Sequence, residues 1–208
     1  MAKINPPFAF HSIRTRPERF PMPIPRLQSA NCALLVIDIQ TKFAKHIAKW
    51  DFLVANSAIL VQMANTLDIP VIVTEQSPQS LGNTTPEITQ HLSKNTPVYI
   101  KTRFSAFTSD VAAQLRTLNR SQIIICGIEA QVCVLQTVLD LAANGRQPFL
   151  ITDAIAATDA SQIPPALRRM EHANAIATGT LSAMYELLQD ATHPKFKACL
   201  DLAKRIQF

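Results

Sequence analysis

The chain has 208 residues, of which 48% are hydrophobic and 17% are charged, so it predicts one ordinary folded domain with a sizeable core. It contains no apolar run of the roughly 18–20 residues that a membrane-spanning helix needs, and no signal-peptide pattern opens it. The cysteines lack the paired spacing of a disulfide framework or a zinc site, which favours free thiols in a reducing, cytoplasmic compartment. They are Cys32, Cys126, Cys133 and Cys199.

The net charge of +5 is concentrated at the start of the chain. Residues 1–30 carry five Lys and Arg side chains against Glu18 alone, together with six prolines, which leaves 15 basic and 14 acidic residues elsewhere. A nearly neutral body without a basic stripe argues against a nucleic-acid partner. We expect 1–30 to be a proline-rich basic arm that packs on its own domain or on a neighbouring subunit, with a disordered tail as the alternative. Residues 31–208 then form the domain.

Short apolar runs alternate with stretches of helical spacing through the rest of the chain. Six runs are typical of strands: 33–37, 69–74, 98–101, the run that starts at Ile123, 148–152 and 175–178. The stretches at 52–67, 107–118, 131–145, 164–173, 181–189 and 194–206 are typical of helices. Continuous apolar strands separated by helices predict an α/β three-layer sandwich, in which helices cover both faces of a six-stranded parallel sheet.

Cys133 is placed in the first turn of one of these helices, directly after a buried strand and Gly127. The partial positive charge of a helix N-terminus lowers a thiol pKa, and its unpaired N–H groups could hold a developing oxyanion. The alternative is a small, inert buried residue, as most free cysteines are.

Two more strand ends carry useful groups. Asp38 ends the first strand and Lys101 ends the third, so a carboxylate, an ammonium and a thiol would meet at the carboxyl edge of a parallel sheet. A thiolate can attack a carbonyl carbon, Lys101 would favour that thiolate by its charge, and Asp38 would carry a proton to the leaving group. Considered alone, Asp38 could be only a cap of the turn after its strand, and Lys101 could be only a solvent-exposed charge at the end of its strand.

Three segments resemble the isochorismatase-like cysteine hydrolase superfamily, which includes nicotinamidases and N-carbamoylsarcosine amidase. They are LLVIDIQ (34–40), YIKTRFSAF (99–107) and CGIEAQVCVLQTVLDL (126–141), and the resemblance spans roughly residues 30–205. The stretches 74–88 and 190–197 are similar to the isochorismatase-domain-containing branch, whose substrates are mostly undefined.

The resemblance implies that Asp38, Lys101 and Cys133 form a catalytic triad. It also implies a cis peptide bond at Ile128–Glu129 that aims the N–H groups of Glu129 and Cys133 at an oxyanion. No organic cofactor and no metal are implied, because Glu75-Gln76-Ser77 stands where nicotinamidases carry a metal-binding histidine. The presence of Cys133 disfavours isochorismatase activity itself, which uses no nucleophilic cysteine.

Six residues near these motifs are candidate substrate contacts. Glu75 and Gln76 end the second strand and would either touch substrate or fix a loop, while Gln40 would bond Asp38, bond the cis turn or lie on the surface. Phe43, Phe104 and Phe107 would form an apolar wall unless they belong to the core.

The function that these residues predict is hydrolysis of a small amide, ureido or related C–N bond through an acyl-enzyme on Cys133. A first alternative is a non-catalytic small-molecule binder or scaffold with the same fold. A second is a redox role for Cys133, for which no motif places a resolving cysteine. We expect a small-molecule substrate, no membrane partner, and a homo-oligomer of at least two subunits.

Overall fold

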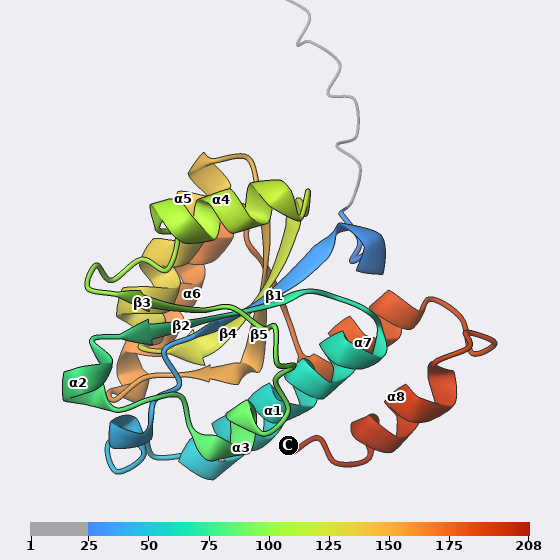
Figure 1. Ribbon diagram of the computed structural model, residues 1–208, viewed down its shortest axis with the longest axis horizontal. Coiled ribbons are helices and arrows are strands. Elements are labelled where there is room, and N and C mark those ends of the chain that lie inside the picture. The colour runs from blue at the N-terminus through green and yellow to red at the C-terminus, as the bar shows by residue number, and fades with distance from the viewer. Residues whose placement is uncertain (1–24) are drawn as a thin grey trace, which may run out of the picture.

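Parallel strands form the centre of the computed structural model, which describes residues 25–208 (Figure 1). Within that range the sheet has six strands. They are β1 (Cys32–Ile37), β2 (Val71–Gln76), β3 (Val98–Lys101), β4 (Gln122–Ile128), β5 (Gln147–Ala156) and β6 (Ile176–Thr178). Every residue of β1 and β4 is buried, which explains why these strands are continuous apolar runs in the sequence.

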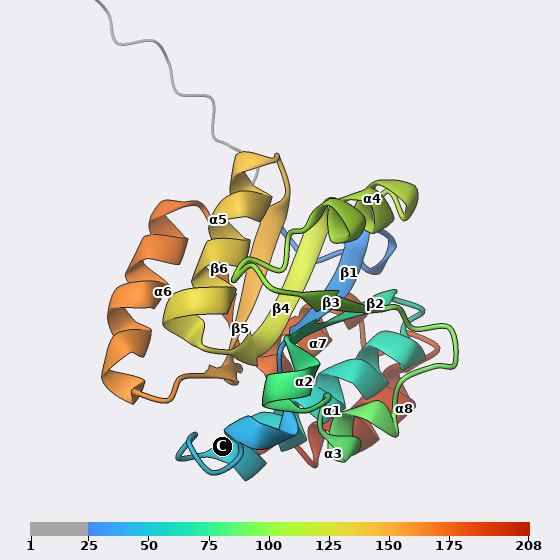
Figure 2. The same cartoon turned by 60° about the vertical axis from the view of Figure 1, so that its left-hand side comes forward.

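Helices cover both faces of the sheet (Figure 2). Leu53, Ile88 and Leu187 belong to the core on one face, and Leu115 and Met170 to the core on the other. The first layer contains α1 (Trp50–Thr66), α3 (Pro86–Thr89), α7 (Thr180–Leu188) and α8 (Phe196–Ala203), and the second contains α4 (Ser109–Thr117), α5 (Leu135–Ala143) and α6 (Ile163–His172). The predicted three-layer α/β fold is therefore confirmed.

The strand order is β3-β2-β1-β4-β5-β6, with parallel pairing throughout the described sheet. The chain moves outward from β1 to β3 and then returns to place β4 against the other side of β1. Loops leaving the carboxyl ends of β1 and β4 consequently diverge, and open α/β sheets bind ligands at such a point of reversed strand order. Asp38 follows β1 and Cys133 follows β4, so both residues lie at this point.

Several elements differ from the sequence prediction. β5 runs to Ala156 because its pairing with β4 shifts register between Ile125 and Gly127, and this shift carries the strand past the apolar run. The loop after β2 contains the short helices α2 (Pro78–Leu81) and α3. The expected helix at 131–145 begins as a π-helix, η3 (Ala130–Val134), before α5. Single-turn 3-10 helices occur at Ser29–Asn31, Thr41–Phe43 and Ala160–Gln162.

Most of the expected arm, residues 1–24, lies outside the described residues. The part that follows packs on the domain, since Leu27 is fully buried and its N–H donates to Glu186 Oε1 at 2.9 Å. The Gln28 N–H likewise donates to Gln122 Oε1 at 2.9 Å. Among residues 25–208, no helix is both long enough and apolar enough to cross a membrane.

Candidate active site

Asp38 is the first residue after β1, and it turns the chain with a left-handed φ of 56° that aspartate tolerates better than most residues. Its carboxylate is buried and accepts two hydrogen bonds. Thr74 Oγ1, near the end of β2, donates to Oδ1 at 2.8 Å, and Lys101 Nζ donates to Oδ2 at 2.6 Å. A buried charge needs such partners, and Asp38 has one from β2 and one from the edge strand β3.

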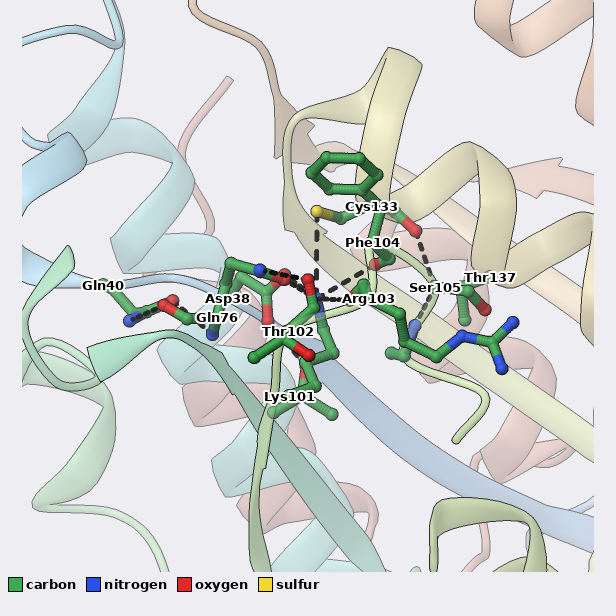
Figure 3. A network of polar contacts seen from close by, with 12 residues as sticks. Asp38, Gln40, Gln76, Lys101, Thr102, Arg103, Phe104, Ser105, Cys133 and Thr137 are labelled. Atoms are coloured by element: carbon green, nitrogen blue, oxygen red, sulfur yellow. Dashed lines mark hydrogen bonds and ion pairs between the residues drawn. The ribbon is translucent and has the colours of Figure 1, made fainter. Parts of the chain in front are cut away.

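Lys101 ends the edge strand β3 and directs its ammonium toward Asp38 and Cys133, where the side chain has no exposed surface (Figure 3). Besides Asp38, Nζ donates to Gln76 Oε1 at 2.8 Å and to the carbonyl of Phe104 at 2.9 Å. The Arg103 carbonyl lies at 3.3 Å. The β3–α4 loop thus wraps around the ammonium and fixes its position.

Cys133 lies in η3, at the end of the turn that joins β4 to α5. Its sulfur is 3.9 Å from Lys101 Nζ, so the structure brings together all three residues that the sequence predicted for one site (Figure 3). Thr137 Oγ1 donates to the Cys133 carbonyl at 2.6 Å and accepts the Ala106 N–H at 2.7 Å. These two bonds connect the thiol-bearing turn to the β3–α4 loop.

Gly127 lets this turn approach β1. Its φ is 154°, and a Cβ at this position would lie 2.5 Å from the carbonyl oxygen of Ile37 and 2.7 Å from the Ile37 Cβ. Neither contact is possible for a real side chain, so the close passage of β4 past the end of β1 requires glycine.

The expected cis peptide bond at Ile128–Glu129 is wrong for this structure, because no peptide bond between residues 25 and 208 is cis. The chain turns instead by the left-handed conformation of Glu129, with φ 53° and ψ 65°. The Glu129 N–H donates no hydrogen bond to any residue from 25 to 208. A free N–H group therefore remains at this turn without a cis bond.

The expected lowering of the Cys133 pKa is also wrong. Burial, first, and the nearby Asp38 carboxylate, second, raise the pKa of this thiol to about 12 against the opposing Lys101 ammonium. The prediction considered the helix terminus but not desolvation, which disfavours the charged form of a buried group. In the resting protein Cys133 is therefore a neutral thiol beside a buried ion pair.

The Isochorismatase domain model matches residues 32–181. This chain belongs to the isochorismatase family. Isochorismatase family protein 1B of Dictyostelium discoideum is 36% identical over 177 residues, which cover 83% of this chain and 86% of that protein. The structure of MAR1 ribonuclease from Caenorhabditis elegans shares 37% identity with a TM-score of 0.83, covering 86% of this chain and 92% of that one.

A second similar structure is that of the YcaC gene product of Escherichia coli, described as an octameric hydrolase of unknown specificity. It has a TM-score of 0.82 over 88% of this chain and 92% of that one, but at 23% identity it shows the shared fold alone. Members of the isochorismatase family are typically hydrolases, and the resemblance found in the sequence motifs is confirmed.

In this family member, two of the candidate substrate contacts hold the loop that follows β2. Glu75 is buried, and its Oε1 accepts both the Thr84 N–H at 2.7 Å and the Thr84 hydroxyl at 2.8 Å. Gln40 is fully buried and exchanges hydrogen bonds with the backbone of Gln76, at 2.8 Å and 3.0 Å, and donates to the Gly82 carbonyl. Gln40 therefore bonds neither Asp38 nor the β4–α5 turn, and it does not lie on the surface.

The aromatic candidates separate into core and site. Phe43 and Phe107 are half-buried and pack against the two hydrophobic cores. Phe104 is 54% exposed and projects on the side of the Cys133 sulfur (Figure 3). Gln76 lies in the site through its contact with Lys101.

Sequence reasoning missed Thr74, Thr137 and also Thr158, whose hydroxyl donates to the Glu129 carboxylate, as partners of the site. Thr74 and Thr158 stand at or just beyond the carboxyl ends of β2 and β5, a position that could have indicated them. Thr137 had no such signal, because its role depends on how α5 packs on the β3–α4 loop. Among residues 25–208, no cluster of three or more His, Cys, Asp or Glu side chains is arranged to hold a metal ion.

Proposed function

We propose that this protein is a cysteine-dependent hydrolase of a small amide, ureido or related C–N bond, acting through an acyl-enzyme on Cys133. The observation that carries the proposal is the buried contact between the Cys133 sulfur and Lys101 Nζ at 3.9 Å, with Asp38 2.6 Å from the same ammonium. A nucleophile, a cation and a proton acceptor at the same sheet edge are the parts that acyl transfer requires.

The neutral resting thiol determines the order of proton transfer. As the Cys133 sulfur attacks the carbonyl carbon, its proton passes to the Asp38 carboxylate, and the Lys101 ammonium stabilises the sulfur while it carries negative charge. The carbonyl oxygen gains that charge in the tetrahedral intermediate, where the N–H groups of Glu129 and Cys133 are the proposed donors.

Collapse of the intermediate breaks the C–N bond. Asp38 returns its proton to the departing nitrogen, so the amine leaves neutral and a thioester remains on Cys133. Water then attacks the thioester, with Asp38 again taking a proton and later returning it to the thiol. At the end of the cycle Asp38 is again a carboxylate and Cys133 a thiol, and no external oxidant or reductant is needed. Gln76 and Phe104, which border the thiol and the ammonium, are the side chains we expect to contact the substrate.

Trapping the acyl-enzyme tests this proposal. The wild-type protein, Cys133→Ala and Asp38→Asn would be incubated with p-nitrophenyl acetate and with a panel of small amides and ureas. Intact-protein mass spectrometry would detect an acyl adduct, and ammonia or amine release would report turnover. We expect an adduct on wild-type Cys133, none there in Cys133→Ala, and much slower formation in Asp38→Asn. Cys199→Ala, a buried cysteine elsewhere in the fold, is the matched control and should behave as wild type.

Other outcomes would favour the alternatives. Tight calorimetric binding of a panel compound without an adduct or release of amine would indicate a binder. Rapid peroxide oxidation of Cys133 would indicate a redox role, which the raised pKa of its thiol disfavours. Because the similar C. elegans protein is named as a ribonuclease, a labelled RNA belongs in the same screen. RNA cleavage that persists in Cys133→Ala would contradict a cysteine hydrolase.

We also propose that the protein is at least a dimer. Two observations support this: the similar E. coli structure is described as octameric, and the edge strand β3 exposes Val98 and Ile100 by 46% and 63%. Exposed apolar side chains on an unpaired strand edge are typical of an interface. Size-exclusion chromatography with light scattering would measure the mass of the protein in solution. A monomer at micromolar concentration would contradict the proposal.

A further inference from the structure

The Glu129 side chain connects the β4–α5 turn to the loop that follows β5. Its Oε2 accepts the side-chain N–H of Gln131 at 2.6 Å. Its Oε1 accepts both the hydroxyl of Thr158 and the Thr158 N–H, the latter at 3.3 Å. One carboxylate thus bonds two segments that are 29 residues apart in sequence.

The connection restrains a residue whose backbone conformation is energetically unfavourable. Glu129 holds a left-handed φ of 53°, a conformation that costs a residue with a side chain free energy and persists only where its surroundings enforce it. The backbone hydrogen bonds of this residue are made by its carbonyl, which accepts the N–H of Val132 at 2.8 Å and that of Val134 at 3.3 Å. The amide side of the residue has no such support within residues 25–208. Beyond its carbonyl bonds and the pairing of Ile128 with Ala156, Glu129 is restrained by its side-chain contacts.

Thr158 is well placed to provide that support. The register shift between β4 and β5 sets Ile128 beside Ala156, so the chain leaves β5 level with the turn. Two residues later Thr158 meets the Glu129 carboxylate with both its N–H and its hydroxyl. Two donors from one residue restrain the carboxylate in direction as well as in distance.

We propose that the Glu129 carboxylate and Thr158 are positioning residues that hold the Glu129 N–H toward the oxyanion of the reacting carbonyl. This inference rests on the proposed function, and it concerns residues to which the sequence motifs assign no side-chain role. The Glu129 charge also raises the pKa of the Cys133 thiol, as Asp38 does and against Lys101, so removing that charge would alter thiolate formation as well as position. Thr158→Val avoids this difficulty because it removes one hydrogen bond and leaves every charge in place.

The experiment compares two reactions of the same sulfur. Acylation by p-nitrophenyl acetate passes through an oxyanion, whereas alkylation by iodoacetamide is a displacement that forms none. Both rates would be measured at Cys133 across pH for wild type, Thr158→Val, Thr158→Ser and Thr152→Val. Thr152 makes the matched control, because it is an exposed β5 threonine whose hydroxyl bonds the Thr178 carbonyl, away from the turn.

We expect Thr158→Val to acylate about tenfold more slowly than wild type while its alkylation rate and pH profile stay unchanged, since a lost oxyanion donor costs 10²–10³-fold and a misdirected one less. Thr158→Ser should recover most of the acylation rate, and Thr152→Val should match wild type. Should Thr158→Val fail to fold, as judged by circular dichroism, Thr158→Ala removes the same hydroxyl in its place.

Two results would overturn the inference alone: wild-type acylation in Thr158→Val, or an equal loss of acylation and alkylation, which would indicate altered access to the sulfur. Absence of any Cys133 acylation in the wild-type protein would overturn the proposed function and this inference with it.

Discussion

Lys101 Nζ lies 2.6 Å from Asp38 Oδ2, and the two side chains are 0% and 2% exposed. The pair joins the end of the edge strand to the end of β1, across β2. Both charges of the pair are buried inside the site and neither reaches the protein surface. Loss of either partner would leave the other charge buried and unpaired.

Removing the Lys101 charge should therefore destabilise the fold. Lys101→Met leaves the Asp38 carboxylate buried with no cation, and breaking a buried pair in this way costs about 3–5 kcal/mol. Urea unfolding measures the change. The control is Lys204→Ala, which removes an ion pair to Asp201 whose side chains are 65% and 64% exposed, and it should cost at most about 0.5 kcal/mol. Adding Asp38→Asn to Lys101→Met should recover stability, and a further loss would contradict the explanation.

The pH dependence of Cys133 alkylation tests the neutral thiol. With its pKa raised to about 12 by burial and by Asp38, the thiol should react slowly with iodoacetamide at pH 7, and the rate should keep rising above pH 9. Asp38→Asn removes a negative charge and should lower the apparent pKa, whereas Lys101→Met should raise it. Peptide mass spectrometry assigns the modified cysteine. A rate that levels off below about pH 7.5 would show a thiolate at neutral pH and contradict the structure.

Gly127 should tolerate no side chain. In Gly127→Ala the new Cβ would overlap the Ile37 carbonyl, so we expect a loss of about 2–4 kcal/mol in the free energy of unfolding and a displaced Cys133. Gly145→Ala is the matched control: that glycine also has a positive φ, of 71°, but nothing lies within 4 Å of its Cβ position. It should lose only the conformational cost of about 1–2 kcal/mol. Equal losses would mean that the contact with β1 is unimportant.

Buried cysteines should make the protein sensitive to alkali. Burial raises the pKa of Cys126 from 9.0 to about 12, so the native state holds this proton where the unfolded state releases it. The stability linked to the proton is complete below about pH 9 and is lost as the pH rises toward 12. Cys126→Ala should reduce the alkaline slope of the unfolding free energy by about 1.4 kcal/mol per pH unit. Ile124→Val, a core truncation in the same strand, should leave the slope unchanged.

The sequence by itself determined the element types and the polar residues that end them. Strands buried on both faces need continuous apolar runs, and parallel strands place their carboxyl ends at one edge, so Asp38, Lys101 and Cys133 could be assigned to one place before any coordinates. The family motifs were equally readable, since they are local in the chain.

Only the tertiary structure decided how these groups behave. The direction of the Cys133 pKa shift depends on how much water the packing of α5 and the β3–α4 loop removes, and desolvation outweighs a helix terminus once the sulfur is buried. The partners of Gln40, Glu75 and Glu129 come from segments remote in sequence, and no local pattern encodes which donor will reach them. Local propensity selects helices and strands, whereas the environment of a side chain is set by long-range packing.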